Sequence, residues 1–171
     1  MHPRQWLAVT SGQALRFFFE RLKDVSDEAG PPVGELLYNA SVLAHFATTS
    51  TASTTYFPGC PASLTTVLDV FVLDRSQHAD PDLMEAAGSQ CLLLTGFFGN
   101  QLRRRHNVNW YAALGAGFYD QAARLGRDKD RVRMMLVMST RFDFWRQQQE
   151  RLAKELRERP MLVQPNGAMG Q

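Results

Sequence analysis

The stretch RVRMMLVMSTRFDFWRQQQERLAKELRER, residues 131–159, decides the fold class of this 171-residue chain. Its large, mostly apolar side chains recur at alternating steps of three and four residues, which places them on one face of an α-helix. The residues on that face are Met135, Met138, Phe142, Trp145, Gln149, Leu152 and Leu156. Asp128 or Asp130 is suited to cap the helix start, and Pro160 ends it. We therefore predict one long C-terminal helix from Arg131 to Arg159, which would span about 43 Å at about 1.5 Å per residue.

The N-terminal part of the chain shows the same helical spacing. One apolar stripe consists of Leu15, Phe18, Phe19, Leu22 and Val25. Thr10 or Ser11 can cap this helix, and the Gly30-Pro31-Pro32 sequence ends it. A second helix is expected after the prolines, and its inner face consists of Leu36, Ala40, Leu43, Ala44 and Ala47.

The middle of the chain contains two further helices and one ambiguous segment. Asp80-Pro81 is a strong helix start, and that helix is expected to continue through Phe98 and Leu102. Another helix begins near Asn109 and stops at Gly126. Residues 48–62 are rich in Ser and Thr and predict a loop. Residues 63–74 fit either a strand or a helix, and we favour a helix because no other stretch offers a strand to pair with it.

These patterns predict an all-α fold: a single-domain bundle of about six helices over residues 1–160, with a long C-terminal helix. Residues 161–171 are expected to form a flexible C-terminal tail. A chain of 171 residues that is 44% hydrophobic is most simply one domain with a sizeable core.

The net charge of +2 conceals an uneven distribution of charged residues. Residues 31–100 carry a net charge of −5, whereas residues 101–171 carry +7. The two portions can neutralise each other within the fold or between subunits. The alternative is a basic surface for an acidic partner, and the modest total charge disfavours a dedicated nucleic-acid-binding protein.

The two cysteines and the apolar runs indicate a cytoplasmic protein. Cys60 and Cys91 have no partner at metal-ligand spacing, so we expect two reduced thiols rather than a disulfide. The N-terminus lacks the features of a signal peptide. The longest apolar runs are far shorter than the about 20 residues that a membrane span requires, so we expect no contact with a membrane.

The stretch GFFGNQLRRRHNVNWY, residues 96–111, contains the candidate anion-binding residues Arg103, Arg104, Arg105 and His106. Consecutive helical residues point about 100° apart, so the three arginines cannot all face one ligand. Cations also interact favourably with the last carbonyls of a helix, and we therefore favour a solvated helix end. One flanking arginine is expected to turn under the helix and pair with Asp120 or Asp143.

Glycines within the helical patterns indicate close helix packing. Gly96, Gly115 and Gly117 each cost up to about 1 kcal/mol relative to Ala inside a helix, so a close approach should offset that cost. We expect Gly96 to meet Gly115 or its neighbours. The alternative is a small-molecule pocket lined by His45, Gly96, Tyr111 and Gly115.

The sequence contains no recognised catalytic, cofactor or metal-binding motif. His45 has no second ligand one helical turn away, so a metal site is disfavoured. Cys91 and His45 would form a nucleophile pair only if folding brought them together. We therefore expect no catalytic residues, no cofactor and no metal, and we favour a non-enzymatic protein.

The leading hypothesis is a protein-interaction or regulatory module. In this interpretation Trp145, Leu152 and Leu156 of the C-terminal helix cover a second subunit or a protein partner. They could equally cover the N-terminal helix of the same chain. The small-molecule pocket is the alternative function, and anion or nucleic-acid binding through Arg103–His106 is a weaker one.

Several motifs of the chain resemble a group of small helical bacterial proteins. The pattern of that group is GD, an apolar stretch, GFF, paired aromatics, MG and AY. It matches Gly88, Leu93-Leu94, Gly96-Phe97-Phe98, Trp110-Tyr111, Leu114-Gly115 and Phe118-Tyr119. ELLYNASVLAHFA and MSTRFDFWRQQQERL resemble two further blocks of the group. The chain differs at Ser89, where an acid is usual, and at Phe118, where a small residue is usual. The resemblance implies a helical fold and a bacterial, cytosolic setting, but no activity.

Overall fold

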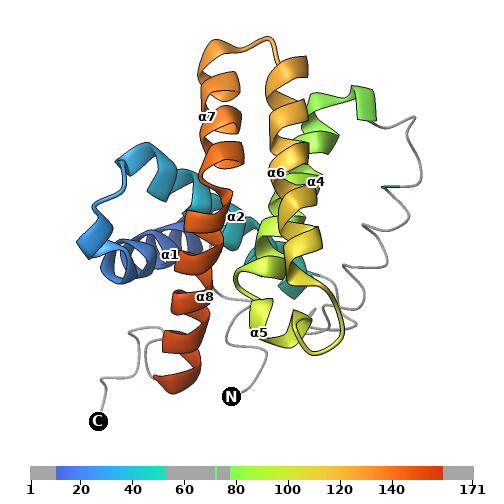
Figure 1. Cartoon of the computed structure of the whole chain (residues 1–171). Coiled ribbons are helices and arrows are strands. Elements are labelled where there is room, and N and C mark those ends of the chain that lie inside the picture. The colour runs from blue at the N-terminus through green and yellow to red at the C-terminus, as the bar shows by residue number, and fades with distance from the viewer. Residues whose placement is uncertain (1–10, 53–71, 73–77, 160–171) are drawn as a thin grey trace.

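The computed structural model describes residues 11–52, 72 and 78–159 of the chain (Figure 1). These residues form seven α-helices and no strand, which confirms the predicted all-α fold. The helices are α1 (Ser11–Val25), α2 (Val33–Ala52), α4 (Pro81–Thr95), α5 (Gly99–Leu102), α6 (Val108–Leu125), α7 (Lys129–Thr140) and α8 (Phe142–Glu158), and a short 3-10 helix, η2 (Asp27–Ala29), follows α1. Among the described helices, none combines the length and apolar character that a membrane crossing needs. The predicted tail over 161–171 lies outside the described residues.

Helices α1 and α2 pack against each other and are joined through η2 and the predicted proline turn. Gly30 has φ = 54°, a left-handed conformation that residues with a side chain rarely adopt. The buried members of the predicted α1 stripe include Phe18 and Leu22. The glycine and the prolines therefore end the N-terminal helical segment and return the chain to form the second helix.

Helix α2 is longer than the sequence predicts, because it continues to Ala52. The hydroxyl of Thr48 donates a hydrogen bond to the carbonyl of Ala44 at 2.8 Å, an arrangement that a helix accommodates. The predicted loop therefore does not begin at residue 48. Of residues 53–74 only Val72 is described, and it is helical, so the question of helix or strand over 63–74 lies largely outside the described residues.

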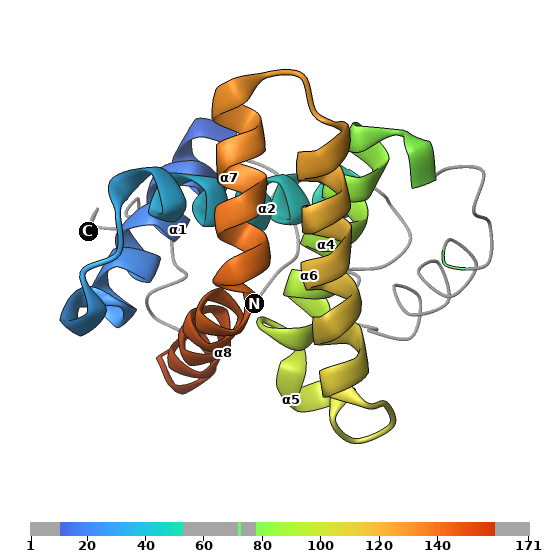
Figure 2. The same cartoon turned by 45° about the horizontal axis from the view of Figure 1, so that its top comes forward.

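Helices α4 and α6 lie side by side and form the central pair of the fold (Figures 1 and 2). The predicted cap of α4 is confirmed, because Asp80 Oδ1 accepts a hydrogen bond from the backbone N–H of Asp82 at 2.8 Å. Asn107 caps α6 in the same way, and the predicted stop at Gly126 is also confirmed. Local capping chemistry thus sets both ends of α6 and the start of α4.

The predicted continuation of α4 through Leu102 is wrong, because the helix ends at Thr95 and Gly96 occupies its C-cap position. The chain then turns and forms the short helix α5. At Gly96 the backbone has φ −99° and ψ −85°, which is not helical. The break moves the arginine run away from the axis of α4.

The predicted single C-terminal helix is also wrong, because it is divided into α7 and α8 at Arg141. Arg141 has φ −105° and ψ 21°, and the two helices follow different directions in Figure 2. The predicted N-cap is confirmed, because Asp128 Oδ1 accepts a hydrogen bond from the N–H of Arg131 at 2.8 Å. Helix α7 packs against α6, and α8 packs against α1 and α4.

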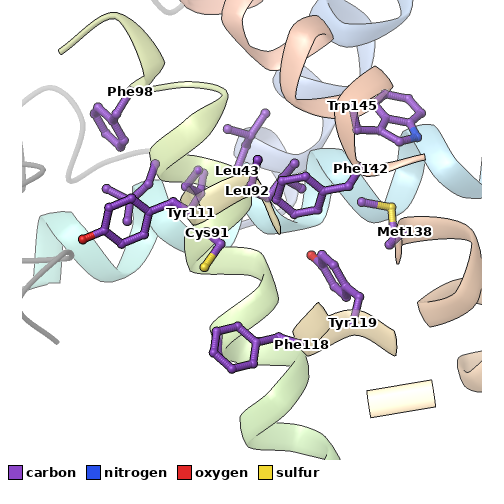
Figure 3. Close-up of a cluster of buried hydrophobic side chains, with 14 of the residues drawn as sticks. Leu43, Cys91, Leu92, Phe98, Tyr111, Phe118, Tyr119, Met138, Phe142 and Trp145 are labelled. Atoms are coloured by element: carbon purple, nitrogen blue, oxygen red, sulfur yellow. The ribbon is translucent and has the colours of Figure 1, made fainter. Parts of the chain in front are cut away.

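A single cluster of buried side chains joins these helices (Figure 3). The ring of Phe142, at the start of α8, lies between residues of α4 and α6 and contacts the ring of Tyr119 with a centroid distance of 6.2 Å. Trp145 follows one turn later and is completely buried. The division at Arg141 therefore lets the first turn of α8 insert two large rings into the core.

Candidate functional site

The space required for the predicted ligand pocket is occupied by protein atoms at two of its four residues. A Cβ atom added at Gly96 would lie 2.9 Å from the carbonyl oxygen of Arg146, and one added at Gly115 would lie 2.5 Å from the ring of Phe142. Both glycines therefore permit a close approach of helices, as predicted. The predicted partner is wrong, because Gly96 faces α8 and Gly115 faces Phe142 and α4, not each other.

The remaining pocket candidates lie in different environments. His45 is exposed on α2, whereas Tyr111 is buried on α6, with its ring 6.0 Å from that of His106. Cys91 is buried, and this burial raises the pKa of its thiol to about 12. A thiol with such a pKa is almost entirely protonated at neutral pH, so the structure does not support a nucleophile pair of Cys91 and exposed His45.

The predicted anion-binding residues Arg103, Arg104, Arg105 and His106 all lie exposed in the turn between α5 and α6. Arg103 forms an ion pair with Glu150 of α8 at 2.5 Å. The expected pairing with Asp120 or Asp143 is therefore wrong, since these acids pair with Arg124 and Arg146 instead. Arg103 links the turn after α5 to α8 at the surface instead, and its side chain is 48% exposed.

A second exposed feature lies beside this turn. Trp110, in the first turn of α6, has 45% of its surface exposed. Within the described residues, neither Arg104 nor Arg105 forms an ion pair. We call Arg104, Arg105, His106 and Trp110 the arginine–tryptophan surface. The turn between α5 and α6, which precedes Trp110, lies at the α5 end of the α4–α6 pair (Figures 1 and 2).

The three predicted interface residues of α8 face the interior of the same chain. Trp145 and Leu152 are completely buried, and Leu156 is partly buried against the core. Helix α8 packs against α1, which is the arrangement that the alternative interpretation of these residues requires. None of the three side chains therefore offers a large apolar surface to a partner.

A buried polar network, not found by the sequence analysis, stabilises the junction of α7 and α8. Glu35 Oε2, on α2, accepts hydrogen bonds from Arg141 Nε at 2.7 Å and from Trp145 Nε1 at 2.8 Å. Gln149 donates to Asn39 Oδ1 at 3.3 Å, and its own oxygen has no described hydrogen-bond partner. The guanidinium of Arg141 also stacks on the ring of Phe144 at 4.4 Å. A buried carboxylate with two donors thus holds Arg141 at the break.

A second missed cluster joins α2, α4, α6 and α7 through hydroxyl groups. The hydroxyl of Tyr38 donates to Glu85 Oε1 at 3.1 Å and lies 3.3 Å from the hydroxyl of Tyr119. Ser89 Oγ lies 3.1 Å from Tyr119 and donates to the carbonyl of Glu85. Arg131 binds the other oxygen of Glu85 with Nε at 2.7 Å. We call these five residues the tyrosine cluster.

Burial is the main influence on the tyrosines of this cluster. It raises the pKa of Tyr38 and of Tyr119 well above 10, because a phenolate is poorly solvated there. The neighbouring charge of Glu85 raises the pKa of both tyrosines further. Both hydroxyls therefore stay protonated near neutral pH and act as hydrogen-bond donors.

The structure also contains a groove between α6 and the junction of α7 and α8, with a volume of about 270 Å³. Ala112, Ala113 and Ala116 line it from α6, and Phe142, Asp143 and Arg146 line it from α8. Among the described residues, no three His, Cys, Asp or Glu side chains gather closely enough to hold a metal ion. We consider this groove and the arginine–tryptophan surface as binding features.

Comparison with family models, curated proteins and solved structures gave no significant match. The resemblance to the group of small helical bacterial proteins stays a prediction. At its two points of difference, Ser89 belongs to the tyrosine cluster, and Phe118 is buried with its ring 6.0 Å from that of His78. Glu85, one turn before Ser89, forms an ion pair with Arg131.

Proposed function

We propose that the chain is a non-enzymatic protein-interaction or regulatory module that binds an acidic segment of a partner through the arginine–tryptophan surface. The observation that carries this proposal is that half-exposed Trp110, in the first turn of α6, closely follows a turn with two exposed arginines. These arginines have no ion-pair partner among the described residues. Tryptophan and arginine are enriched among the residues that dominate the binding energy of protein interfaces. A partner segment would cover the indole with an apolar side chain and place carboxylates near the guanidinium groups.

The charge distribution supports an acidic partner. Part of the positive charge of residues 101–171 is neutralised within the fold, because Arg141 pairs with Glu35 and Arg131 pairs with Glu85. Arg103 is likewise matched by Glu150. Arg104 and Arg105 have no such match in the described structure, so their charges are available to an acidic partner.

The expected affinity is modest. Each exposed ion pair contributes about 0.2–1 kcal/mol, so two arginines alone would not give stable binding of a partner. Desolvation of the indole would supply most of the binding free energy. We therefore expect binding to weaken with salt but not to vanish, since the apolar contribution is not screened.

Anion or nucleic-acid binding through Arg103–His106 is the weaker proposal. Surfaces for single-stranded nucleic acids stack successive bases on several aromatic rings within a basic groove. In the described turn, Trp110 is the exposed ring, and Tyr111 beside it is buried. This arrangement favours an acidic protein segment over a nucleic acid.

The test is a binding titration with a labelled peptide in which glutamates flank a central leucine. A peptide with glutamines in place of the glutamates and a labelled oligothymidylate serve as comparison ligands. Trp110→Ala and the pair Arg104→Gln with Arg105→Gln should each weaken binding of the glutamate peptide about tenfold. Leu136→Ala is the matched control, because Leu136 is also 45% exposed but lies on α7.

Two outcomes would contradict the proposal. Equal binding of the glutamate and glutamine peptides would show that the arginines do not recognise carboxylates. Tighter binding of the oligothymidylate, with a steep loss of affinity in salt, would favour the nucleic-acid alternative.

A further inference from the structure

The groove between α6 and the α7–α8 junction presents a small apolar floor. Asn109, Ala112, Ala113 and Ala116 line it at helical spacing, so they share one face of α6. The hydroxyl of Ser139 donates to the carbonyl of Ala116 at 2.8 Å and holds α7 at one side of this face. Pockets for drug-sized ligands have volumes of about 300–1,000 Å³. With a volume of about 270 Å³, the groove accommodates only a smaller molecule.

An ion pair with unused hydrogen-bonding capacity forms the other side of the groove. Arg146 Nε donates to Asp143 Oδ1 at 2.7 Å, and the side chain of Arg146 is only 16% exposed whereas that of Asp143 is 75% exposed. The two amino groups of Arg146 and the second oxygen of Asp143 have no partner among the described residues. The amino groups of Arg146 are accessible, since the buried side-chain polar atom without a partner in the described structure is Gln149 Oε1. They can therefore donate charge-assisted hydrogen bonds to a bound anion.

The charges of this pair restrict the chemistry of the ligand. A simple carboxylate would be attracted by Arg146 but repelled by Asp143. A simple amine would be attracted by Asp143 but repelled by Arg146. A molecule that carries both groups on one carbon can satisfy both residues at once. The alanine floor then offers apolar surface to a compact side chain.

We propose that this groove binds a small zwitterion of the α-amino-acid class with an aliphatic side chain. Arg146 holds the carboxylate through its amino groups, Asp143 holds the ammonium, and the side chain lies over Ala112, Ala113 and Ala116. The site shares no residue with the arginine–tryptophan surface. It therefore goes beyond the proposed interaction function and does not depend on it.

The test uses the full chain and three related compounds. Leucine carries both charged groups, 4-methylpentanoate lacks the ammonium, and 3-methylbutylamine lacks the carboxylate. In titrations followed by two-dimensional amide NMR, we expect leucine to bind with a dissociation constant on the order of 1 mM. Each analogue should bind at least about tenfold more weakly, because it loses one charge-assisted hydrogen-bonded contact.

Variants of the groove locate the binding. Arg146→Gln and Ala113→Leu should each reduce leucine affinity at least about tenfold, the first by removing the carboxylate contact and the second by filling the groove. Arg124→Gln is the matched control, because Arg124 and Asp120 form a similar Nε–Oδ pair at 2.9 Å outside the groove. Ala113 is exposed, so Ala113→Leu should fold normally even if Arg146→Gln does not.

Three results would overturn the proposal. The first is the absence of leucine binding up to about 50 mM, which is far above the expected dissociation constant. The second is equal binding of leucine and 4-methylpentanoate. The third is leucine binding that survives Ala113→Leu unchanged.

Discussion

The α4–α6 contact and the α7–α8 junction both border the core, but different interactions stabilise them. In the first, Gly88 and Gly115 leave space for aromatic rings: a Cβ atom at Gly88 would lie 3.0 Å from the ring of Tyr119. In the second, the carboxylate of Glu35 accepts hydrogen bonds from Arg141 and Trp145. The apolar contact therefore requires small residues, whereas a buried carboxylate binds the residue at which the helix changes direction.

The largest expected effect on stability comes from adding a side chain at Gly115, in the α4–α6 contact. Gly115→Ala should destabilise the fold by about 3 kcal/mol, because overpacking forces shifts of rings and backbone. The new Cβ atom would lie 2.5 Å from Phe142 and 2.7 Å from Cys91. Gly117→Ala is the matched control, since no atom lies within 4 Å of the added Cβ atom. It should stabilise the helix by about 0.5–1 kcal/mol. Urea unfolding of the two variants measures the difference, and equal stabilities would refute the close contact at Gly115.

The second-largest expected effect concerns the hydrogen bonds of Glu35 at the junction of α7 and α8. Glu35→Gln should lower the free energy of unfolding by about 2 kcal/mol, because the buried acceptor loses the charge that faces Arg141. Glu150→Gln, which removes the charge from the surface pair with Arg103, should cost less than about 1 kcal/mol. Thermal and urea unfolding of both variants provide the comparison. A larger loss for Glu150→Gln would mean that Glu35 does not hold the break.

The tyrosine cluster, at the edge of the α4–α6 contact, predicts a pH dependence. The pKa values of Tyr38 and Tyr119 are raised in the folded state, so the folded chain keeps protons that the unfolded chain loses. Their contribution to stability is therefore complete below about pH 10, the usual tyrosine pKa, and is lost as the pH rises above it. Urea unfolding between about pH 8 and about pH 11 should show this loss, and Tyr38→Phe should reduce its slope. An unchanged slope in Tyr38→Phe would contradict the role assigned to Tyr38.

The smallest expected effect on stability is that of Trp110→Ala, at a residue assigned to binding and not to the core. Trp110→Ala should change the free energy of unfolding by less than about 0.5 kcal/mol, because much of its ring already contacts solvent and neither core contact uses it. The same variant should weaken binding of the glutamate peptide. Circular dichroism melting is sufficient for the first measurement. A large loss of stability would place Trp110 among the residues that hold the fold, rather than on a binding surface.

Much of the fold could be predicted from local patterns. The cap at Asp80, the stop at Gly126 and the buried face with Phe142 and Trp145 all depend on residues near each other in the chain. The close contact at Gly115 was predicted from the cost of a glycine inside a helix. The same prediction is wrong for Gly117, where an added Cβ atom would have no neighbour within 4 Å.

The division of the C-terminal helix could not be predicted in this way. The sequence around Arg141 continues the helical spacing without interruption, and the acceptor that binds the Arg141 side chain is Glu35 on α2. Helical periodicity predicts which face of a helix is buried. It cannot predict a contact with a carboxylate that is distant in the chain. An acid on the largely apolar α2 was the available signal, since a charge is rarely buried without a partner.

The candidate sites were predicted only in part. The exposure of the arginine run follows from its position after a helix end, and this agrees with the sequence analysis. The partner of Arg103 and the neighbours of Gly96 both belong to α8, whose direction is set by the unpredicted break. The groove beside Arg146 was missed for the same reason, because it exists only once α8 has turned at Arg141.

The most direct test of the proposed function is to map where the glutamate peptide binds on the full chain by two-dimensional NMR. We expect the largest shifts at the indole N–H of Trp110 and at the backbone amides of Arg104 and Arg105. Shifts concentrated instead around Val33, Leu37 and Leu136, the exposed apolar residues of α2 and α7, would contradict this expectation.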